Sequence, residues 1–142
     1  MEQGQSLIVD FSKIGSTELG FISVWEQGKR FPFEVKRVFW TYKTPSEVQR
    51  GNHVHFNTRE ILIAAAGQID LELEYPDGVK ERYELSRPDM GIFVPEYCWR
   101  TMRYSQGAVQ LTLASCCYSE DDYIRDYESF KRTFTNWKRN SI

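Results

Sequence analysis

Residues 69–85, IDLELEYPDGVKERYEL, constrain the fold of this chain more than any other segment. Apolar side chains at positions 69, 71, 73 and 75 alternate with acidic side chains at 70, 72 and 74, and the turn residues Pro76, Asp77 and Gly78 follow. An alternation with a period of two is typical of a strand that buries one face and exposes the other. The segment therefore predicts a β-hairpin that is packed by one face only.

Further short runs of strand type, separated by turn residues, occupy most of the chain: FISVWEQ, FEVKRVFWTY, REILIAAAG, GIFVPE and AVQLTLASCCY. Regularly spaced short strands favour a sandwich or a barrel. The run ILIAAA is apolar on both faces, which predicts a strand covered on both sides. We therefore expect an all-β fold in a single domain over residues 1–142, a length that one hydrophobic core can serve.

The C-terminal segment SEDDYIRDYESFKRTFTNWKR departs from this strand pattern. Ser119 and Asp122 resemble a helix cap, and the acidic residues at 120–122 suit the positive end of a helix dipole. The segment predicts a helix over about residues 120–138, packed against the β body or a second subunit. The large apolar residues of this segment recur at helical spacing: Tyr123, Ile124, Tyr127, Phe130, Phe134 and Trp137.

The charge balance argues against a nucleic-acid partner. Eighteen basic and twenty acidic residues give a formal charge of −2, and no run of Lys or Arg offers a footprint for a phosphate backbone. The N-terminal sequence lacks the basic and apolar regions of a signal peptide, and no apolar run reaches the length of a membrane span. The three cysteines lack the spacing of zinc or redox sites. We expect a soluble cytoplasmic protein.

Both histidines of the chain, His53 and His55, lie one residue apart in the segment RGNHVH. On a strand, residues i and i+2 share a face, so the two imidazoles point into the same space. Together with Gly51, Glu60 and Gly67, they follow the spacing of the first sequence motif of the cupins, which are small jelly-roll proteins. This similarity implies a cupin-type jelly-roll β-barrel that carries the C-terminal helix.

The segment PEYCWR resembles the second cupin motif, which supplies a last histidine ligand in metal-binding cupins, but Arg100 stands at that position here. A guanidinium cannot lose its proton to ligate an ion, and it repels a divalent cation. We therefore expect neither a metal nor another cofactor. Two alternatives stay open: a ferrous-iron site of His53, His55 and Glu60 with open positions, and a purely structural role for the two histidines inside the barrel.

Without a metal, two imidazoles suit proton transfer, because a free imidazole has a pKa near neutral pH. Arg37, Arg50 and Arg100 lie on or beside segments that are expected to line the barrel. Arginine binds phosphates through paired, charge-assisted hydrogen bonds. These residues indicate an anionic substrate.

Several segments together resemble one family: FPFEVKRVFWTY, RGNHVH, DMGIFVPEYCWRTM and LASCCYSEDDYIRDYESF. They are similar to the dTDP-4-keto-6-deoxyglucose 3,4-ketoisomerases, the FdtA/QdtA-like (WxcM-like) cupins of bacterial sugar-nucleotide pathways, from about residue 20 to residue 131. The resemblance implies a homodimer without metal that acts on dTDP-4-keto-6-deoxyglucose or a close relative. Its keto group would move from C4 to C3, in the biosynthesis of deoxyamino sugars for surface glycans such as the lipopolysaccharide O-antigen.

The resemblance also implies catalytic residues. The two histidines transfer protons in this family, so His53 is expected to be the base and His55 to polarise or reprotonate the oxygen at C4. An aromatic hydroxyl on the preceding strand assists in the family, where tyrosines often occupy the positions that read Phe39-Trp40 here. Tyr42 is therefore expected to take this role, while Trp40 would stack on the base or the sugar.

Other residues are expected to bind the substrate. Arg50 and Arg100 would hold the diphosphate or stabilise an enediolate, with Arg37 also facing the site. Trp99 would cover the sugar or the thymine, and Glu60, where the family would have glutamine, would orient an imidazole.

Two functions of other kinds stay open, a metal-dependent cupin enzyme and a cupin that binds a nucleotide sugar without turning it over. A 3,5-epimerase is not favoured, since the sequence suggests no pairing of a histidine with an aspartate.

Overall fold

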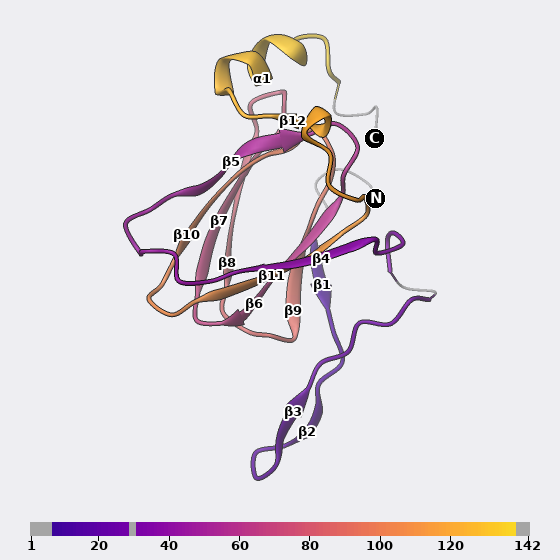
Figure 1. Cartoon of the computed structure of the whole chain (residues 1–142), viewed down its shortest axis with the longest axis vertical. Helices are drawn as coiled ribbons and strands as arrows, with labels where there is room; N and C mark the ends of the chain where they lie inside the picture. Colours follow the sequence, from indigo (N-terminus) through magenta and orange to yellow (C-terminus); the bar gives the residue numbers. More distant parts are fainter. Residues whose placement is uncertain (1–6, 29–30, 139–142) are drawn as a thin grey trace.

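The computed structural model describes residues 7–28 and 31–138. Two five-stranded antiparallel sheets face each other, and a two-stranded hairpin projects away from one end of them (Figure 1). The strand order is β1-β9-β6-β11-β4 in the first sheet and β12-β5-β10-β7-β8 in the second, and β2 and β3 form the hairpin. The predicted all-β jelly roll of cupin type is confirmed.

The first sheet contains β1 (Ile8–Asp10), β9 (Met90–Val94), β6 (Glu60–Ala66), β11 (Val109–Ala114) and β4 (Arg37–Thr41). The second contains β12 (Tyr123–Ile124), β5 (Arg50–His55), β10 (Trp99–Tyr104), β7 (Ile69–Glu74) and β8 (Lys80–Leu85). The projecting hairpin consists of β2 (Ile14–Ser16) and β3 (Gly20–Ile22). A short 3₁₀ helix, η1 (Glu120–Asp122), and one α-helix, α1 (Tyr127–Thr133), complete the described elements.

The hairpin predicted from residues 69–85 is formed by β7 and β8, which pair with Ile69 opposite Leu85. The inward side chains of Ile69 and Leu71 are at most 2% exposed, whereas Glu72 faces solvent and accepts a hydrogen bond from Arg82 at 2.8 Å. In β6, residues 61–64 are buried on both faces, as the sequence predicts, whereas Ala65 and Ala66 at the end of the apolar run are exposed.

The C-terminal helix is shorter than the predicted range of 120–138. Tyr123 and Ile124 form the strand β12 instead, because the edge of β5 offers unpaired backbone groups and strand pairing satisfies them. The cap is Asp126, whose carboxylate accepts a hydrogen bond from the Ser129 N–H at 2.9 Å, and Ser119 makes no side-chain cap.

The helix α1 packs on the outer face of the second sheet. Phe130 is fully buried and stacks on Trp99 with ring centroids 5.5 Å apart, so this part of the predicted aromatic stripe serves as core. Within the described residues, none of the helices has both the length and the apolar character that crossing a membrane requires.

Candidate active site

A cavity of about 240 Å³ opens between the two sheets, and we call it the central cavity. Four residues predicted for the site lie on its wall: Arg50, His53, Glu60 and Arg100. The remaining lining comes from β4, β5, β6, β10, β11 and the segment after η1: Phe39, Thr41, Gly51, Leu62, Met102, Tyr104, Gln110, Tyr123 and Arg125.

A bulge in β5 directs both Arg50 and His53 toward the central cavity. The register of β5 against β10 shifts between Gly51 and His53, which leaves Asn52 as an extra residue. Gly51 and Asn52 have φ angles of 85° and 55°, and a Cβ on Gly51 would lie 2.6 Å from the carbonyl oxygen of Arg100. Only glycine fits such a position. The glycine of the RGNHVH segment therefore lets two side chains at an odd spacing face the same space.

His53 has a defined proton arrangement. Its Nδ1 lies 3.0 Å from the carbonyl oxygen of Gly51, which can only accept, so Nδ1 carries the proton and donates. Burial, and then the nearby Arg100 guanidinium, lower the pKa of His53 to about 3. The ring is therefore neutral near pH 7, and Nε2 keeps a lone pair that can accept a proton.

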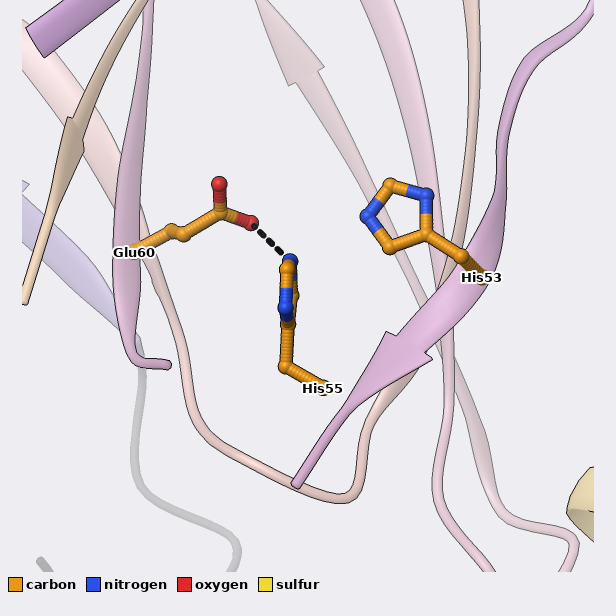
Figure 2. A group of neighbouring side chains, drawn as sticks. All are labelled: His53, His55 and Glu60. Carbon is orange, nitrogen blue, oxygen red and sulfur yellow. Dashed lines mark ion pairs between the residues drawn. The ribbon is translucent and has the colours of Figure 1, made fainter. Parts of the chain in front are cut away.

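His55 lies behind the wall of the central cavity and is fully buried. Figure 2 shows its ring turned toward Glu60, with Nε2 3.6 Å from the Glu60 Oε1. The other nitrogen, Nδ1, lies 2.9 Å from Oδ2 of Asp122. Burial, followed by the Arg100 charge, lowers the pKa of His55, so this ring is also neutral. The structure thus contains a histidine–aspartate pair, which corrects the expectation that the chain has none; the partners lie 67 residues apart in sequence.

Arg100 and Glu60 form a buried ion pair across the barrel. Arg100 is 1% exposed; its Nη1 donates to Oε1 of Glu60 and its Nη2 donates to the carbonyl of Cys98 at 3.0 Å. Burial raises the pKa of Glu60, and the Arg100 charge opposes that rise. The guanidinium stabilises the carboxylate that desolvation would otherwise neutralise.

A metal does not suit this arrangement. Ligand atoms of His53, His55 and Glu60 all lie within 4.8 Å of one another, which is close enough to share an ion. The Glu60 oxygen is taken by Arg100, however, and a divalent cation there would sit beside a fixed positive charge.

Arg37 lies beside the central cavity without lining it. Its guanidinium carbon is 5.3 Å from the ring centroid of Phe39 and 5.6 Å from that of Tyr118, and its charge contributes to lowering the pKa of His53. Its Nε is buried and has no hydrogen-bond partner among the described residues. The positive charge of Arg37 therefore lies near the site, and its Nε–H is not hydrogen-bonded to any described group.

Three predicted residues do not reach the central cavity. Phe39 and Thr41 of β4 line it, so the alternate residue Trp40 points outward and is 60% exposed. Tyr42, which continues the outward series, is 58% exposed. Trp99 precedes the inward Arg100 on β10, so it faces α1 instead. The structure places all three outside the central cavity, and the roles predicted for Tyr42 in catalysis and for Trp40 and Trp99 in substrate binding stay predictions.

The sequence reasoning missed two tyrosines. Tyr104 donates from its hydroxyl to Gln110 Oε1 at 2.9 Å, and burial raises its pKa to about 12. The Tyr123 ring lies 4.3 Å from the ring of His55 and 5.1 Å from that of His53. Alternation from Arg100 along β10 would have identified Tyr104, but no local signal assigns Tyr123, because it reaches the site through the pairing of β12 with β5.

A protein-family model, FdtA, described as WxcM-like, C-terminal, matches residues 4–135. The TDP-4-oxo-6-deoxy-alpha-D-glucose-3,4-oxoisomerase of Aneurinibacillus thermoaerophilus is 31% identical over 129 residues, which are 90% of this chain and 91% of that protein. A 3,4-ketoisomerase from Helicobacter canadensis has a similar structure, with a TM-score of 0.84, 35% identity, and coverage of 90% of this chain and 96% of that one.

The sugar 3,4-ketoisomerase QdtA from Thermoanaerobacterium thermosaccharolyticum, crystallised with TDP, matches with a TM-score of 0.86 and 30% identity over 94% of this chain and 97% of its own. A histidine-to-asparagine variant of QdtA was crystallised with TDP-4-keto-6-deoxyglucose. Matches over most of both chains at this identity, on a shared fold, show common family membership. The chain therefore belongs to the FdtA family of WxcM-like proteins and is an enzyme related to the sugar 3,4-ketoisomerases.

Proposed function

We propose that this enzyme moves the keto group of a dTDP-4-keto-6-deoxyhexose from C4 to C3, using proton transfer by His53. The observation that carries this proposal is the neutral His53 on the wall of the central cavity, with Nδ1–H bound to the Gly51 carbonyl. This arrangement leaves Nε2 as the proton acceptor. The relatives' activities support the substrate class.

The reaction has a simple proton balance. His53 removes the proton at C3, and the electrons of that C–H bond form an enediolate between C3 and C4. His53 then returns the proton at C4. The proton of the C3 hydroxyl is transferred to the C4 oxygen, so that C3 becomes the ketone and C4 carries the hydroxyl. General acid–base help of this kind contributes roughly 10²–10⁴-fold.

The enediolate oxygen needs a positive group, and Arg100 is placed for this task. Arg100 lies opposite His53 in the pairing of β5 with β10, and both line the central cavity. Because Arg100 is fixed by Glu60 and the Cys98 carbonyl, no reorganisation is needed as negative charge develops. Glu60 lies between the central cavity and His55. A second proton route would run from the cavity through Glu60 to His55.

The first experiment is proton NMR of the protein with dTDP-4-keto-6-deoxyglucose in deuterated buffer, with and without a chelator. We expect 3-keto signals, deuterium at the exchanging carbons, and no effect of the chelator. Loss of turnover on chelation would make Glu60 a metal ligand and replace the proposal by a metal-dependent reaction. Unchanged substrate with intact binding would identify a nucleotide-sugar-binding protein instead.

His53→Asn keeps a polar side chain of similar size but removes the base. We expect loss of turnover with nucleotide-sugar affinity retained, because Asn cannot take the C3 proton. Undiminished turnover in this variant would refute the assignment of His53.

The cellular setting follows from the proposed reaction. We propose a cytoplasmic single-domain enzyme of deoxyamino-sugar biosynthesis that works as a homodimer. Apolar side chains of the β2–β3 hairpin support the dimer, since Ile14, Leu19 and Ile22 are 56%, 92% and 64% exposed. Light scattering coupled to size exclusion measures the assembly directly.

A further inference from the structure

Asp122 belongs to no part of the reaction described above, although it is the buried partner of a site histidine. It is 7% exposed and lies at the end of η1, directly before β12. Its side chain accepts hydrogen bonds from three donors: Nδ1 of His55 at 2.9 Å, the backbone N–H of Asn57 at 2.6 Å, and the hydroxyl of Thr58. A carboxylate can satisfy all three donors, because both of its oxygens accept.

The surroundings of His55 leave it little freedom. The backbone of Asp122 accepts from the Phe56 N–H at 3.0 Å, and Tyr123 pairs with His55 in the β12–β5 ladder. The Tyr123 ring also lies against the imidazole, with centroids 4.3 Å apart. Asp122 and Tyr123 therefore hold the imidazole at one nitrogen and on one face.

We infer that Asp122 is a positioning residue, which holds His55 in the Nδ1–H tautomer and turns its Nε2 lone pair toward Glu60 and the central cavity. Only Nε2 can then accept a proton, and it lies on the substrate side, 3.6 Å from Oε1 of Glu60. The effect of this positioning on catalysis rests on the proposed ketoisomerase function. The tautomer of His55 is independent of that function.

Replacing Asp122 by Asn changes what the three hydrogen-bond donors meet, because an amide has only one accepting atom. The backbone N–H of Asn57 cannot reverse, so the amide oxygen must face it, and the amide NH₂ then faces His55 and Thr58. The Thr58 hydroxyl can rotate to accept. The His55 ring must accept at Nδ1, which moves its proton to Nε2 and removes the lone pair from the cavity side.

The test combines turnover with the tautomer, read from two-bond ¹H–¹⁵N correlations of the imidazole nitrogens. The chain has only two histidines, so a His55→Gln variant assigns both rings. For Asp122→Asn we expect an Nε2–H tautomer at His55 and a fall in kcat of roughly 10²–10⁴-fold, as for loss of an acid–base group, with KM nearly unchanged. A merely structural aspartate would change thermal stability without changing the tautomer.

The matched control is Thr58→Val, which keeps the shape but removes a different donor to Asp122. Here we expect the Nδ1–H tautomer of His55 to persist. The inference is overturned if wild-type His55 is the Nε2–H tautomer, a result that needs no variant to fold, or if Asp122→Asn keeps both the Nδ1–H tautomer and full turnover. If the wild type fails to isomerise the sugar, the proposed function fails while the tautomer result still decides the positioning of His55.

Discussion

Arg100→Met should destabilise the fold strongly, because it leaves the Glu60 carboxylate buried without its cation. Arg100 and Glu60 are 1% and 3% exposed, so water cannot replace the missing partner without rearrangement. Breaking a buried ion pair by removing one member costs about 3–5 kcal/mol. The free energy of unfolding of a domain is about 5–15 kcal/mol, so the variant loses a large share of it.

The size of this effect can be followed by urea unfolding. With a slope of about 2 kcal/mol per molar urea, a loss of 3–5 kcal/mol moves the unfolding midpoint down by about 2 M.

The loss of stability should also depend on pH. Burial raises the pKa of Glu60, and without Arg100 only the smaller effect of the Arg37 charge opposes that rise. The folded variant then binds a proton that the unfolded chain releases above pH 4.5, so its deficit grows as the pH rises, by up to about 1.4 kcal/mol per unit.

The double variant Arg100→Met with Glu60→Gln separates charge from packing. It has no buried charge at this position, so we expect it to be more stable than Arg100→Met alone, and its deficit should not grow with pH. The reasoning is refuted if the double variant is as unstable as Arg100→Met, or if the deficit of the single variant is below about 1 kcal/mol at every pH.

Two further predictions concern activity. Because the pKa of His53 is lowered to about 3, kcat/KM should stay level between pH 8 and pH 5, whereas an enzyme with an ordinary histidine base would lose activity below about pH 6.5. The measurement is a pH–rate profile with the nucleotide sugar. A fall in kcat/KM centred near pH 6.5 would contradict the argument that burial lowers this pKa. Tyr42→Phe should keep wild-type turnover, since Tyr42 lies on the outer, exposed side of the barrel; a large drop in kcat would return its hydroxyl to the reaction.

Strand periodicity predicted much of the fold and part of the site. The alternation in residues 69–85 and the apolar run in β6 favoured a sandwich or a barrel. The resemblance to the first cupin motif placed His53 and Glu60 in one site, and both line the central cavity. The same periodicity places Trp40 on the face opposite to Arg37, three residues earlier, and Trp99 on the face opposite to the adjacent Arg100, because residues at an odd spacing on a strand face opposite ways. The prediction that both tryptophans face the site rested on residue type and not on strand geometry.

Other features depend on tertiary contacts that no local pattern contains. Tyr123 and Ile124 fit the helical spacing of the aromatic stripe, yet the free edge of β5 captures them as a strand and ends the helix early. The same pairing brings Asp122 to His55 from 67 residues away. Helical spacing and caps express local preferences. Here the hydrogen bonds that β12 forms with the edge strand β5 outweigh those preferences.

The charges around the central cavity indicate how a nucleotide sugar would be oriented. Arg100 and Arg125 each form an ion pair with a glutamate, so their charge is largely compensated. Arg37 and Arg50 form no ion pair within the described residues, whereas a buried Nε without a hydrogen-bond partner is found there on both Arg37 and Arg100. A guanidinium without a carboxylate partner gains most from an anion that supplies hydrogen-bond acceptors. The diphosphate should therefore lie toward Arg37 and Arg50, which directs the keto sugar toward Arg100 and the Nε2 of His53.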